Sequence, residues 1–420
     1  MQSSWRVGSL FGIPLLIDPS WFFVLALITL SDGSVFQQNH PEWGATIAWG
    51  TGLLMALLLF TSVLLHELGH SLVAKLQGIQ VKSITLFFFG GIAAIEQEPK
   101  TPGKAFQVAI AGPLVSFSLF ILLSLLTLVL PGDSTPVVVL TQRLAVINLV
   151  LTLFNLIPGL PLDGGLVLKA IIWKITGSHF QGVHWAARTG KTLGSLAIVL
   201  AILGVFGRAI PTFTGFYMAL IGWFVVKNAT AYDQQTTLQE ALLKINAEDA
   251  MTREFRVVDA NLTLRQFADD YLLSASRAPV YFAASDGRYR GRVDADALHA
   301  IERSQWEVKT VFSIVQPLSE IPSVQESTAL VDVIRLMETQ ELPRVTVLSP
   351  AGAISGVIDR GDVMRSLSKK MNLPISDAAI KQIKDEGIYP PGLPLGAIAK
   401  AAADFRKPFQ QPLQSVERSR

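Results

Sequence analysis

The chain has 420 residues, of which 50% are hydrophobic and only 16% are charged, whereas about a quarter of the residues in a typical soluble protein are charged. The absence of cysteine excludes disulfide bonds and thiolate metal sites. A formal net charge of +2 without a basic stripe gives no reason to expect nucleic acid as a partner. The shortage of charge is greatest before residue 230, so we expect a membrane domain followed by a water-soluble part.

Six apolar runs predict a polytopic α-helical membrane domain over residues 1–230. The predicted spans are residues 18–31, 44–76, 105–130, 137–158, 190–206 and 210–229. Asp18 is expected to cap the first helix and Pro19 to begin it. The N-terminus has one early Arg6 and no small-residue cleavage site, so no cleaved signal peptide is expected.

Lysine and arginine gather in one alternate set of connections, which the positive-inside rule places in the cytoplasm. That set comprises Arg6, Lys75, Lys82, Lys100, Lys104, Lys169, Lys174, Arg188, Lys191 and Lys227, whereas Arg208 lies in the opposite set and Arg143 falls inside the fourth span. Both termini and the soluble part are therefore expected in the cytoplasm. We expect an integral multi-pass protein, with the bacterial inner membrane as its location.

The second predicted span carries the run His66-Glu-Leu-Gly-His70 near its cytoplasmic end. Ionisable groups at membrane depth are costly and are retained for function. Spacing i, i+4 places His66 and His70 on one face of a helix, as two imidazoles must lie to bind one zinc ion. Glu67 stands beside them, where a carboxylate takes a proton from bound water. The pattern predicts a zinc hydrolase with its active site within the membrane.

Catalytic zinc requires three protein ligands and one open position. The fourth span ends in Asn155-Leu-Ile-Pro-Gly-Leu-Pro-Leu-Asp163-Gly-Gly165, and this helix break is tolerated at membrane depth where it is buried or lines a wet cavity. Asp163 is the only acid between residues 134 and 232 and lies on the same side as His70, so we select it as the third ligand. The alternative is that Asp163 merely caps a helix over residues 164–176.

Residues 83–95 have a strand-like composition around a glycine turn and predict a hairpin. Its edge would hold an unwound substrate as an added strand, or the hairpin would merely pack on helices. The remaining histidines are expected in loops or in the soluble part, with surface or capping roles; they are His40, His179, His184 and His299.

Residues 245–370 contain an internal repeat of about 65 residues, in copies over 245–305 and 308–368. Gly287 aligns with Gly352, and Asp294 with Asp359. Each copy predicts the order strand, helix, strand, strand, helix, with residues 280–283 and 344–348 as the strands before the glycine turns. Residues 371–420 form a polar, proline-dotted tail that is predicted to be partly disordered, with a short helix near 377–386.

These motifs resemble the site-2 protease family of intramembrane zinc metalloproteases. The resemblance is carried by His66-Glu-Leu-Gly-His70, then Asn155-x-x-Pro158, then Leu162-Asp163-Gly164. The repeat resembles the CBS pair that one branch of that family carries at its C-terminus. The implied fold is a helical membrane domain with a membrane-embedded β-loop, followed by a soluble α/β CBS-pair domain, over about residues 5–370.

The resemblance implies one Zn²⁺ per subunit, with His66, His70 and Asp163 as ligands and Glu67 as general base. Asn155 would be a helper near the site, and Phe89, Gly90 and Gly91 resemble the family's substrate-binding loop beside the active site. The run Ala111-Gly112-Pro113-Leu114 resembles its third-helix motif. Ser116 stands where some relatives have Asn, which argues against a polar role at that position.

The implied function is hydrolysis of peptide bonds in or near transmembrane segments, so the expected partners are the lipid bilayer and a membrane protein substrate. The CBS pair implies regulation, an adenine nucleotide ligand and a homodimer. Asp362 fits the nucleotide position of the second copy, and a packing role without ligand is the alternative. The competing functions are a CBS-gated transporter or channel with a metal-binding His/Asp cluster, and an inactive scaffold. Glu67, which a hydrolase needs, favours the protease.

Overall fold

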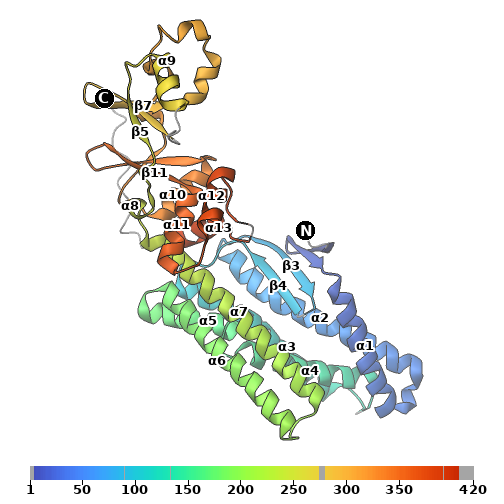
Figure 1. The fold of residues 1–420 in the computed structure, drawn as a ribbon. Helices are drawn as coiled ribbons and strands as arrows, with labels where there is room; N and C mark the ends of the chain where they lie inside the picture. The colour runs from blue at the N-terminus through green and yellow to red at the C-terminus, as the bar shows by residue number, and fades with distance from the viewer. Residues whose placement is uncertain (1–3, 89, 133, 274–279, 391, 406–420) are drawn as a thin grey trace. The chain divides into compact units, whose positions relative to one another are not determined.

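A computed structural model of the protein describes residues 4–88, 90–132, 134–273, 280–390 and 392–405. The chain forms two compact units, Met1–Thr236 and Thr237–Arg420 (Figure 1). Each unit has its own buried hydrophobic clusters. Helix α7 belongs to both, because it runs without interruption across the boundary between them.

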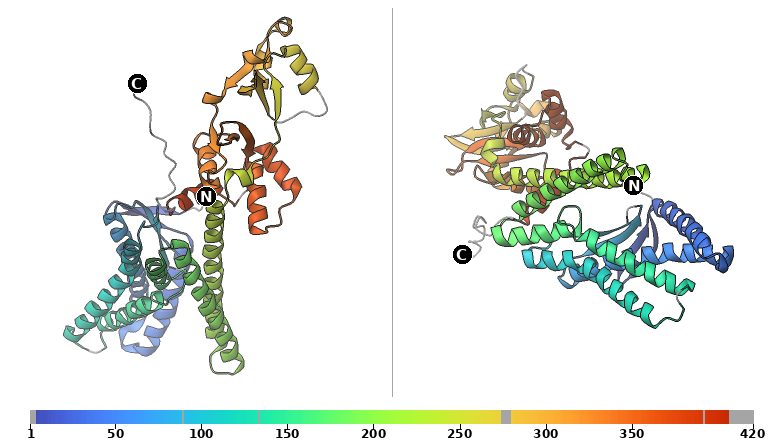
Figure 2. Two further views of the ribbon diagram at one scale, coloured as in Figure 1. Left: turned by 90° about the vertical axis from the view of Figure 1, so that its left-hand side faces the viewer. Right: turned by 90° about the horizontal axis from the view of Figure 1, so that it is seen from below.

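Seven long helices build most of the first unit. They are α1 (Ser20–Asn39), α2 (Gly44–Leu76), α3 (Pro102–Val129), α4 (Pro136–Asn155), α5 (Asp163–Thr176), α6 (His179–Phe206) and α7 (Thr212–Lys244), with a short 3-10 turn η1 (Pro41–Trp43) before α2. Helix α2 packs against α1 and α3, and α3 packs against α4 and α5 (Figure 2).

Five of the described helices are long and apolar enough to cross a membrane: α1, α2 together with η1, α3, α4 and α6. They overlap the first five predicted spans, with boundaries that differ by between none and 11 residues. The sixth predicted span, residues 210–229, falls almost entirely in α7, which begins at Thr212 and is not among the five. Helix α6 begins 11 residues before its predicted start of 190, since the Ser178 hydroxyl accepts a hydrogen bond from the Gln181 amide and caps it there.

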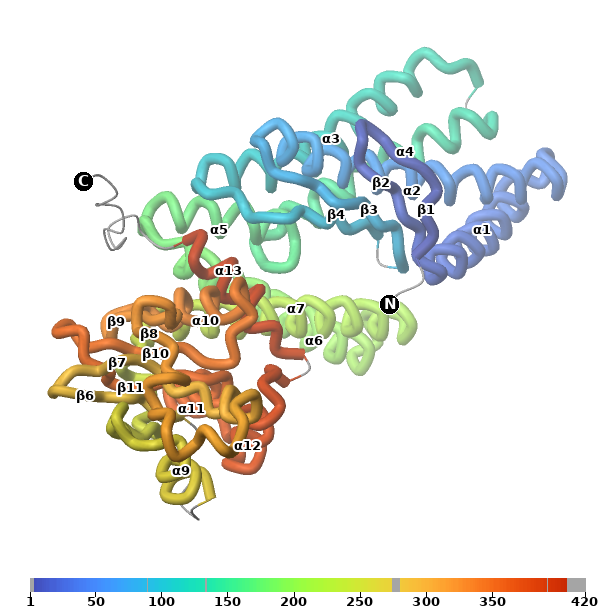
Figure 3. The backbone as a smooth tube through the Cα atoms, turned by 90° about the horizontal axis from the view of Figure 1, so that it is seen from above, coloured from blue at the N-terminus to red at the C-terminus, as the bar shows by residue number. Residues whose placement is uncertain are grey.

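A four-stranded sheet lies beside α2 in the first unit. Its strands are β1 (Trp5–Leu10), β2 (Ile13–Ile17), β3 (Val81–Phe87) and β4 (Gly90–Ile95), hydrogen-bonded in that order (Figure 3). The antiparallel pair β3–β4 is the predicted hairpin. The sequence patterns did not predict β1 and β2. They are joined by a tight turn at Phe11 and Gly12, both with positive φ, and β2 pairs with β3 in parallel.

The connection between α4 and α5 is the predicted helix break. The Leu160 amide in this connection donates to the Ala186 carbonyl of α6 at 3.1 Å, so its backbone is held inside the protein rather than exposed to lipid. Asp163 then opens α5 as its first residue. The helix break therefore determines the position of the Asp163 backbone, from which its side chain extends.

The second unit repeats one strand–helix–strand–strand pattern. Its strands are β5 (Arg256–Asp259), β6 (Tyr281–Ser285), β7 (Arg288–Val293), β8 (Val315–Pro317), β9 (Ser323–Gln325), β10 (Arg344–Leu348) and β11 (Ile354–Asp359). Its helices after α7 are α8 (Ala247–Ala250), α9 (Leu264–Phe267), α10 (Leu330–Thr339), α11 (Arg360–Met371), α12 (Asp377–Glu386) and α13 (Leu395–Ala403). The other helical elements are the π-helix η2 (Ala268–Leu272) and the 3-10 turns η3 (Ala295–Ala300), η4 (Arg303–Gln305), η5 (Val311–Ile314) and η6 (Leu318–Glu320).

The two copies of the repeat share strand pairing. In each, a first strand pairs in parallel with a second, which pairs antiparallel with a third: β5, β6 and β7 in one copy, β9, β10 and β11 in the other. The aligned Gly287 and Gly352 both have positive φ in the turns, which explains why glycine recurs there. The first copy departs from the prediction, because its last helix is only the 3-10 turn η3.

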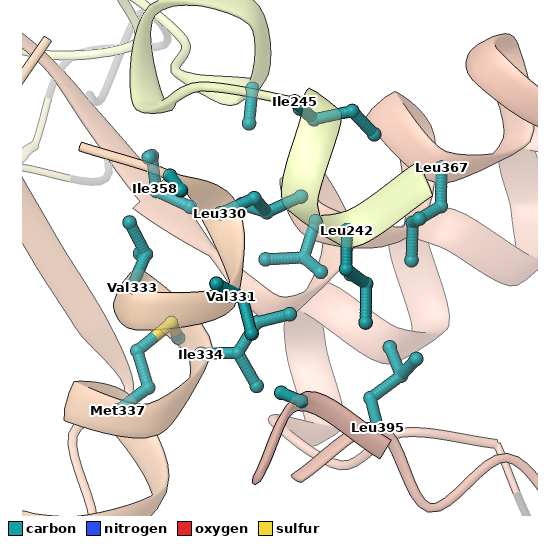
Figure 4. Close-up of a cluster of buried hydrophobic side chains, with 14 of the residues drawn as sticks. Leu242, Ile245, Leu330, Val331, Val333, Ile334, Met337, Ile358, Leu367 and Leu395 are labelled. Atoms are coloured by element: carbon teal, nitrogen blue, oxygen red, sulfur yellow. The ribbon is translucent and has the colours of Figure 1, made fainter. Parts of the chain in front are cut away.

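The predicted tail is partly ordered, because α12 occupies the short helix expected near 377–386 and α13 follows it. Their buried side chains, among them Ile383 and Leu395, join the core of the second copy. Figure 4 shows Leu395 in this core with Leu242, Ile334 and Leu367. The predicted short helix is therefore present as α12, whereas α13 was not predicted, and the apolar faces of both helices pack on that core. Residues 406–420 lie outside the described part of the chain.

Candidate metal centre

His66 and His70 lie on one face of α2, as their i, i+4 spacing requires. Both are buried, at 4% and 7% exposure, and their Nε2 atoms are 3.3 Å apart. The Asp163 Oδ2 atom lies 3.0 Å from His66 Nε2 and 3.2 Å from His70 Nε2. Among the described residues these three side chains form the group of ligand atoms that lies within 4.8 Å of one another.

Asp163 does not serve as the cap of α5. The N-cap residue is Leu162, and no side chain caps this helix end. The carboxylate instead turns toward the two imidazoles, which joins residues 97 and 93 positions apart in the chain. Its place in the first turn of α5 adds the favourable field of a helix N-terminus to a negative charge.

The donor atoms fit a zinc ion. Ligands about 2.1 Å from one metal at tetrahedral angles lie about 3.4 Å from each other, close to the three distances in this cluster. His70 Nδ1 lies 2.7 Å from the Val108 carbonyl, which only accepts, so Nδ1 carries a proton, and in the neutral ring Nε2 then presents its lone pair. A neutral ring would turn that lone pair toward the Asp163 carboxylate at 3.2 Å, an arrangement that a bound cation would stabilise.

Glu67 stands next to this cluster and beneath β4. Its carboxylate accepts a hydrogen bond from the Ala93 backbone and lies within electrostatic range of His66, His70 and Asp163. A Cβ atom on Gly91 would lie 2.6 Å from Glu67 Cγ, so only glycine allows the strand this close to the carboxylate.

β4 is the edge strand of the four-stranded sheet, and in the described part of the chain its outer side pairs with no further strand. The Glu96 amide donates to Gln80 in the direction of β3 at 2.9 Å. Because backbone groups alternate along an antiparallel strand, Gly91, Ala93 and Ile95 point away from β3, in agreement with the contact between Ala93 and Glu67. The free edge of the sheet therefore runs past the candidate base.

The remaining predicted site residues are Phe89, Gly90, Gly91 and Asn155, and only some of them lie beside Glu67 in the structure. Gly90 and Gly91 begin β4 next to Glu67, whereas Phe89 lies outside the described residues. Asn155 is the half-buried last residue of α4, and within the described chain no hydrogen bond joins it to the three ligand-type side chains. Its helper role stays a prediction.

Ser116 is a site residue that the sequence reasoning set aside. It is fully buried, and its hydroxyl lies 2.9 Å from His66 Nδ1. Position 116 therefore has a polar role in this chain, contrary to the prediction. The missed signal was the spacing of Val108, Gly112 and Ser116 along α3, one turn apart, opposite the two histidines.

The prediction for His179 is also wrong, because the sequence led us to expect it and His184 in a loop with surface roles. Both lie in α6, and His179 is buried with its Nε2 2.9 Å from Glu98 Oε2. The buried Lys169 of α5 places its Nζ 2.8 Å from the same oxygen. Burial alone would raise the pKa of Glu98, but Lys169 and His179 hold that pKa well below its usual value.

Asp362 of the second unit is engaged within its own unit. Its carboxylate is 1% exposed and contacts Arg365 at 2.8 Å, Lys384 of α12 at 3.3 Å and the Thr252 hydroxyl at 3.4 Å. Burial, and then repulsion from Asp359, raises the pKa of Asp362. A nucleotide that used this carboxylate would have to displace Lys384.

Fold and cluster together define an integral membrane protein with a His/His/Asp centre of the metallohydrolase type. Comparison with known proteins agrees with this class. The model of peptidase family M50 matches residues 54–142 and 133–202, and the CBS domain model matches residues 311–369.

Two relatives match over most of their length. A Synechocystis sp. protein named as a zinc metalloprotease is 41% identical over 372 residues, covering 87% of this chain and 96% of its own. Rip3 of Mycobacterium tuberculosis, also named as a zinc metalloprotease, is 30% identical over 367 residues, covering 87% and 93%. A solved site-2 protease from Methanocaldococcus jannaschii is 30% identical over 55% of this chain and 95% of its own, with a TM-score of 0.39.

This chain belongs to the site-2 protease family, peptidase family M50, and carries CBS sequence in its soluble part. It is therefore a zinc metalloprotease of the intramembrane type. Family membership favours the hydrolase over the gated transporter or channel and over the inactive scaffold that the sequence alone left open.

Proposed function

We propose that His66, His70 and Asp163 hold one Zn²⁺ per subunit and that Glu67 is the general base of an endopeptidase acting in or near transmembrane segments of membrane-tethered proteins. The observation that carries this proposal is the approach of Asp163 Oδ2 to within 3.2 Å of both Nε2 atoms, with Glu67 at their side. Zinc bound there would supply Lewis acidity, polarising the scissile carbonyl and making water a stronger acid.

The chain's own residues supply the remaining chemistry. Glu67 takes the proton of the attacking water and delivers it to the leaving amine. A helical substrate shields its carbonyls with internal hydrogen bonds, so the segment to be cut must be extended. Gly91 and Ile95 offer backbone groups at the outer edge of β4, on either side of the Ala93 amide that Glu67 holds, and there an extended substrate adds as a further strand beside Glu67. Asn155 is retained as a helper, and Gly90 and Gly91 as the described part of the substrate loop.

We further propose that the metal centre and the second unit face the cytoplasm of a bacterial inner membrane, as the distribution of lysine and arginine indicates. The division into a protease domain over 1–230, a CBS pair over 245–370 and a tail from 371 belongs to this proposal. The CBS pair is its regulatory part, with an adenine nucleotide as ligand and a homodimer as assembly. Asp362 would reach the nucleotide only after release from Lys384.

The proposal is tested with purified wild type, Glu67→Gln and Asp163→Ala in lipid, measuring both zinc content and cleavage of a membrane-anchored peptide. Glu67→Gln should retain one zinc per chain and lose cleavage by about 10²-fold or more, because the base is gone while the ligands remain. Asp163→Ala should lose zinc. Normal cleavage by the Glu67 variant, or unchanged zinc in the Asp163 variant, contradicts the assigned roles.

A further inference from the structure

Helix α3 presents three different groups, one turn apart, to the histidines of α2. The Val108 carbonyl lies 2.7 Å from His70 Nδ1, and the Ser116 hydroxyl lies 2.9 Å from His66 Nδ1. Gly112 stands between them in the sequence. A Cβ atom there would overlap His70 Nε2 and lie 2.7 Å from His66 Nε2. All three positions are buried, so water does not substitute for these contacts.

The spacing of these three residues on α3 equals the spacing of the two histidines on α2. Val108, Gly112 and Ser116 are each four apart, as are His66 and His70, so both sets form straight rows on their helices. The helices approach closely between the rows, because Gly69 has no side chain and a Cβ on it would lie 3.0 Å from the Ala111 carbonyl. Each imidazole therefore meets its own partner on α3 across a fixed and short gap.

We propose that α3 positions the metal ligands. Ser116 is the positioning residue of His66, and the Val108 carbonyl is that of His70. Gly112 has no side chain and so leaves room for both Nε2 atoms to approach the metal. This inference rests on the proposed zinc role of the two histidines. An acceptor on Nδ1 keeps the proton there and directs the Nε2 lone pair toward the metal. The Val108 carbonyl does this for any side chain at 108, whereas the acceptor for His66 depends on the residue at 116.

The chemistry of a serine suits this place. Its hydroxyl accepts the Nδ1 proton of His66, and the rotation of its own hydrogen adjusts to either state of the ring. Alanine at 116 would leave Nδ1 without a partner in a buried site, and the ring would be free to turn. Alanine at 112 would put a methyl group where the two imidazoles converge, so one of them would have to move away.

The test is the zinc dissociation constant of the full-length protein in detergent, measured by competition with a chelator and independent of cleavage. Ser116→Ala should raise the constant about 10- to 100-fold, the range for lost partners of metal ligands. Gly112→Ala should raise it at least as much. The matched controls on the same helix are Ser118→Ala, whose exposed hydroxyl bonds to Leu114, and Gly103→Ala, which has open space around it; both should bind zinc like wild type.

Cobalt substitution gives a second readout, since the visible spectrum reports ligand geometry. It should change in Ser116→Ala and stay as in wild type in Ser118→Ala. Ser116→Thr, which keeps the hydroxyl, should bind zinc more tightly than Ser116→Ala, and metal-free unfolding curves separate lost folding from lost affinity. A zinc constant for Ser116→Ala within about twofold of wild type overturns the inference. Failure of wild type itself to bind one zinc would overturn the proposed function instead.

Discussion

Glu98 is a residue of the first unit whose carboxylate contacts two buried side chains at once. It follows β4, about half of its side chain is exposed, and it receives both the buried Lys169 ammonium and the buried His179 ring. These contacts tie the end of the candidate substrate strand to α5, whose first residue is Asp163. Removing the negative charge would leave Lys169 buried beside an uncharged partner, which is costly.

We therefore expect Glu98→Gln to lower the free energy of unfolding at pH 7 by about 1–2 kcal/mol, less than for a fully buried pair because Glu98 is half exposed. The measurement is thermal unfolding in detergent. The depressed pKa sets the pH dependence: the stability from Glu98 is present above its unfolded pKa of about 4.3 and is lost as pH falls through the lower folded value. The gap between wild type and variant should thus narrow below about pH 4.3.

Glu96→Gln is the control for this prediction, because Glu96 pairs with Lys82 at 3.6 Å on the surface. Surface pairs contribute little, so its unfolding should follow wild type at every pH. Equal unfolding of the Glu98 variant and wild type at pH 7 would show that the Lys169 and His179 contacts do not stabilise the fold.

Single residues were predictable where their chemistry was rare in context. Two histidines and an acid in apolar segments have few purely structural roles. The structure brings His66, His70 and Asp163 together as the sequence indicated. Ser116 and His179 were missed because serine and histidine are common in ordinary roles. Their partners lie 50 and 81 residues away, and only the packing of the helices shows which atoms meet.

At the scale of elements, β4 is the strand whose position matters most. Its first residues pass over Glu67, and its outer edge is unpaired within the four-stranded sheet. The hairpin was predictable from its β-branched and aromatic composition and its glycines. The preceding pair β1–β2 was not, because every residue of β1 is exposed and the inside–outside alternation that marks a strand is absent.

Gly91→Ala should separate substrate cutting from metal binding. The new Cβ would lie 2.6 Å from Glu67 Cγ, so either the carboxylate or the strand must shift, while the side chains of His66, His70 and Asp163 are untouched. We expect a loss of cleavage of about 10-fold or more with zinc content unchanged, since small displacements of a catalytic group are costly. Cleavage rate and zinc content are measured on the same preparation.

Gly103→Ala controls for the exchange of glycine for alanine, because nothing lies within 4 Å of a Cβ at that position of α3. It should cleave like wild type. If Gly91→Ala also cleaved at the wild-type rate, the close approach of β4 to Glu67 would have no part in the reaction.

At the scale of the whole molecule, the candidate metal centre is built from residues of the first unit. The ligand-type side chains His66, His70 and Asp163, and their partners Val108 and Ser116, all lie in Met1–Thr236. The second unit has a separate core, to which the last turns of α7 contribute Leu238 and Leu242. The rise in the share of charged residues after residue 230 indicated this division. The sequence did not show that one helix, α7, runs through it.

A protein shortened after Lys244, at the end of α7, should therefore still bind one zinc per chain with the affinity of the full chain. Its Leu238 and Leu242 lose the core that buries them, so a version with serine at both positions controls for aggregation. Basal cleavage should persist in both versions. Any response of cleavage to ATP or AMP should be present only in the full chain, because the CBS pair is removed. Loss of zinc from the shortened chain with helical content retained would mean that the second unit holds the metal centre in shape.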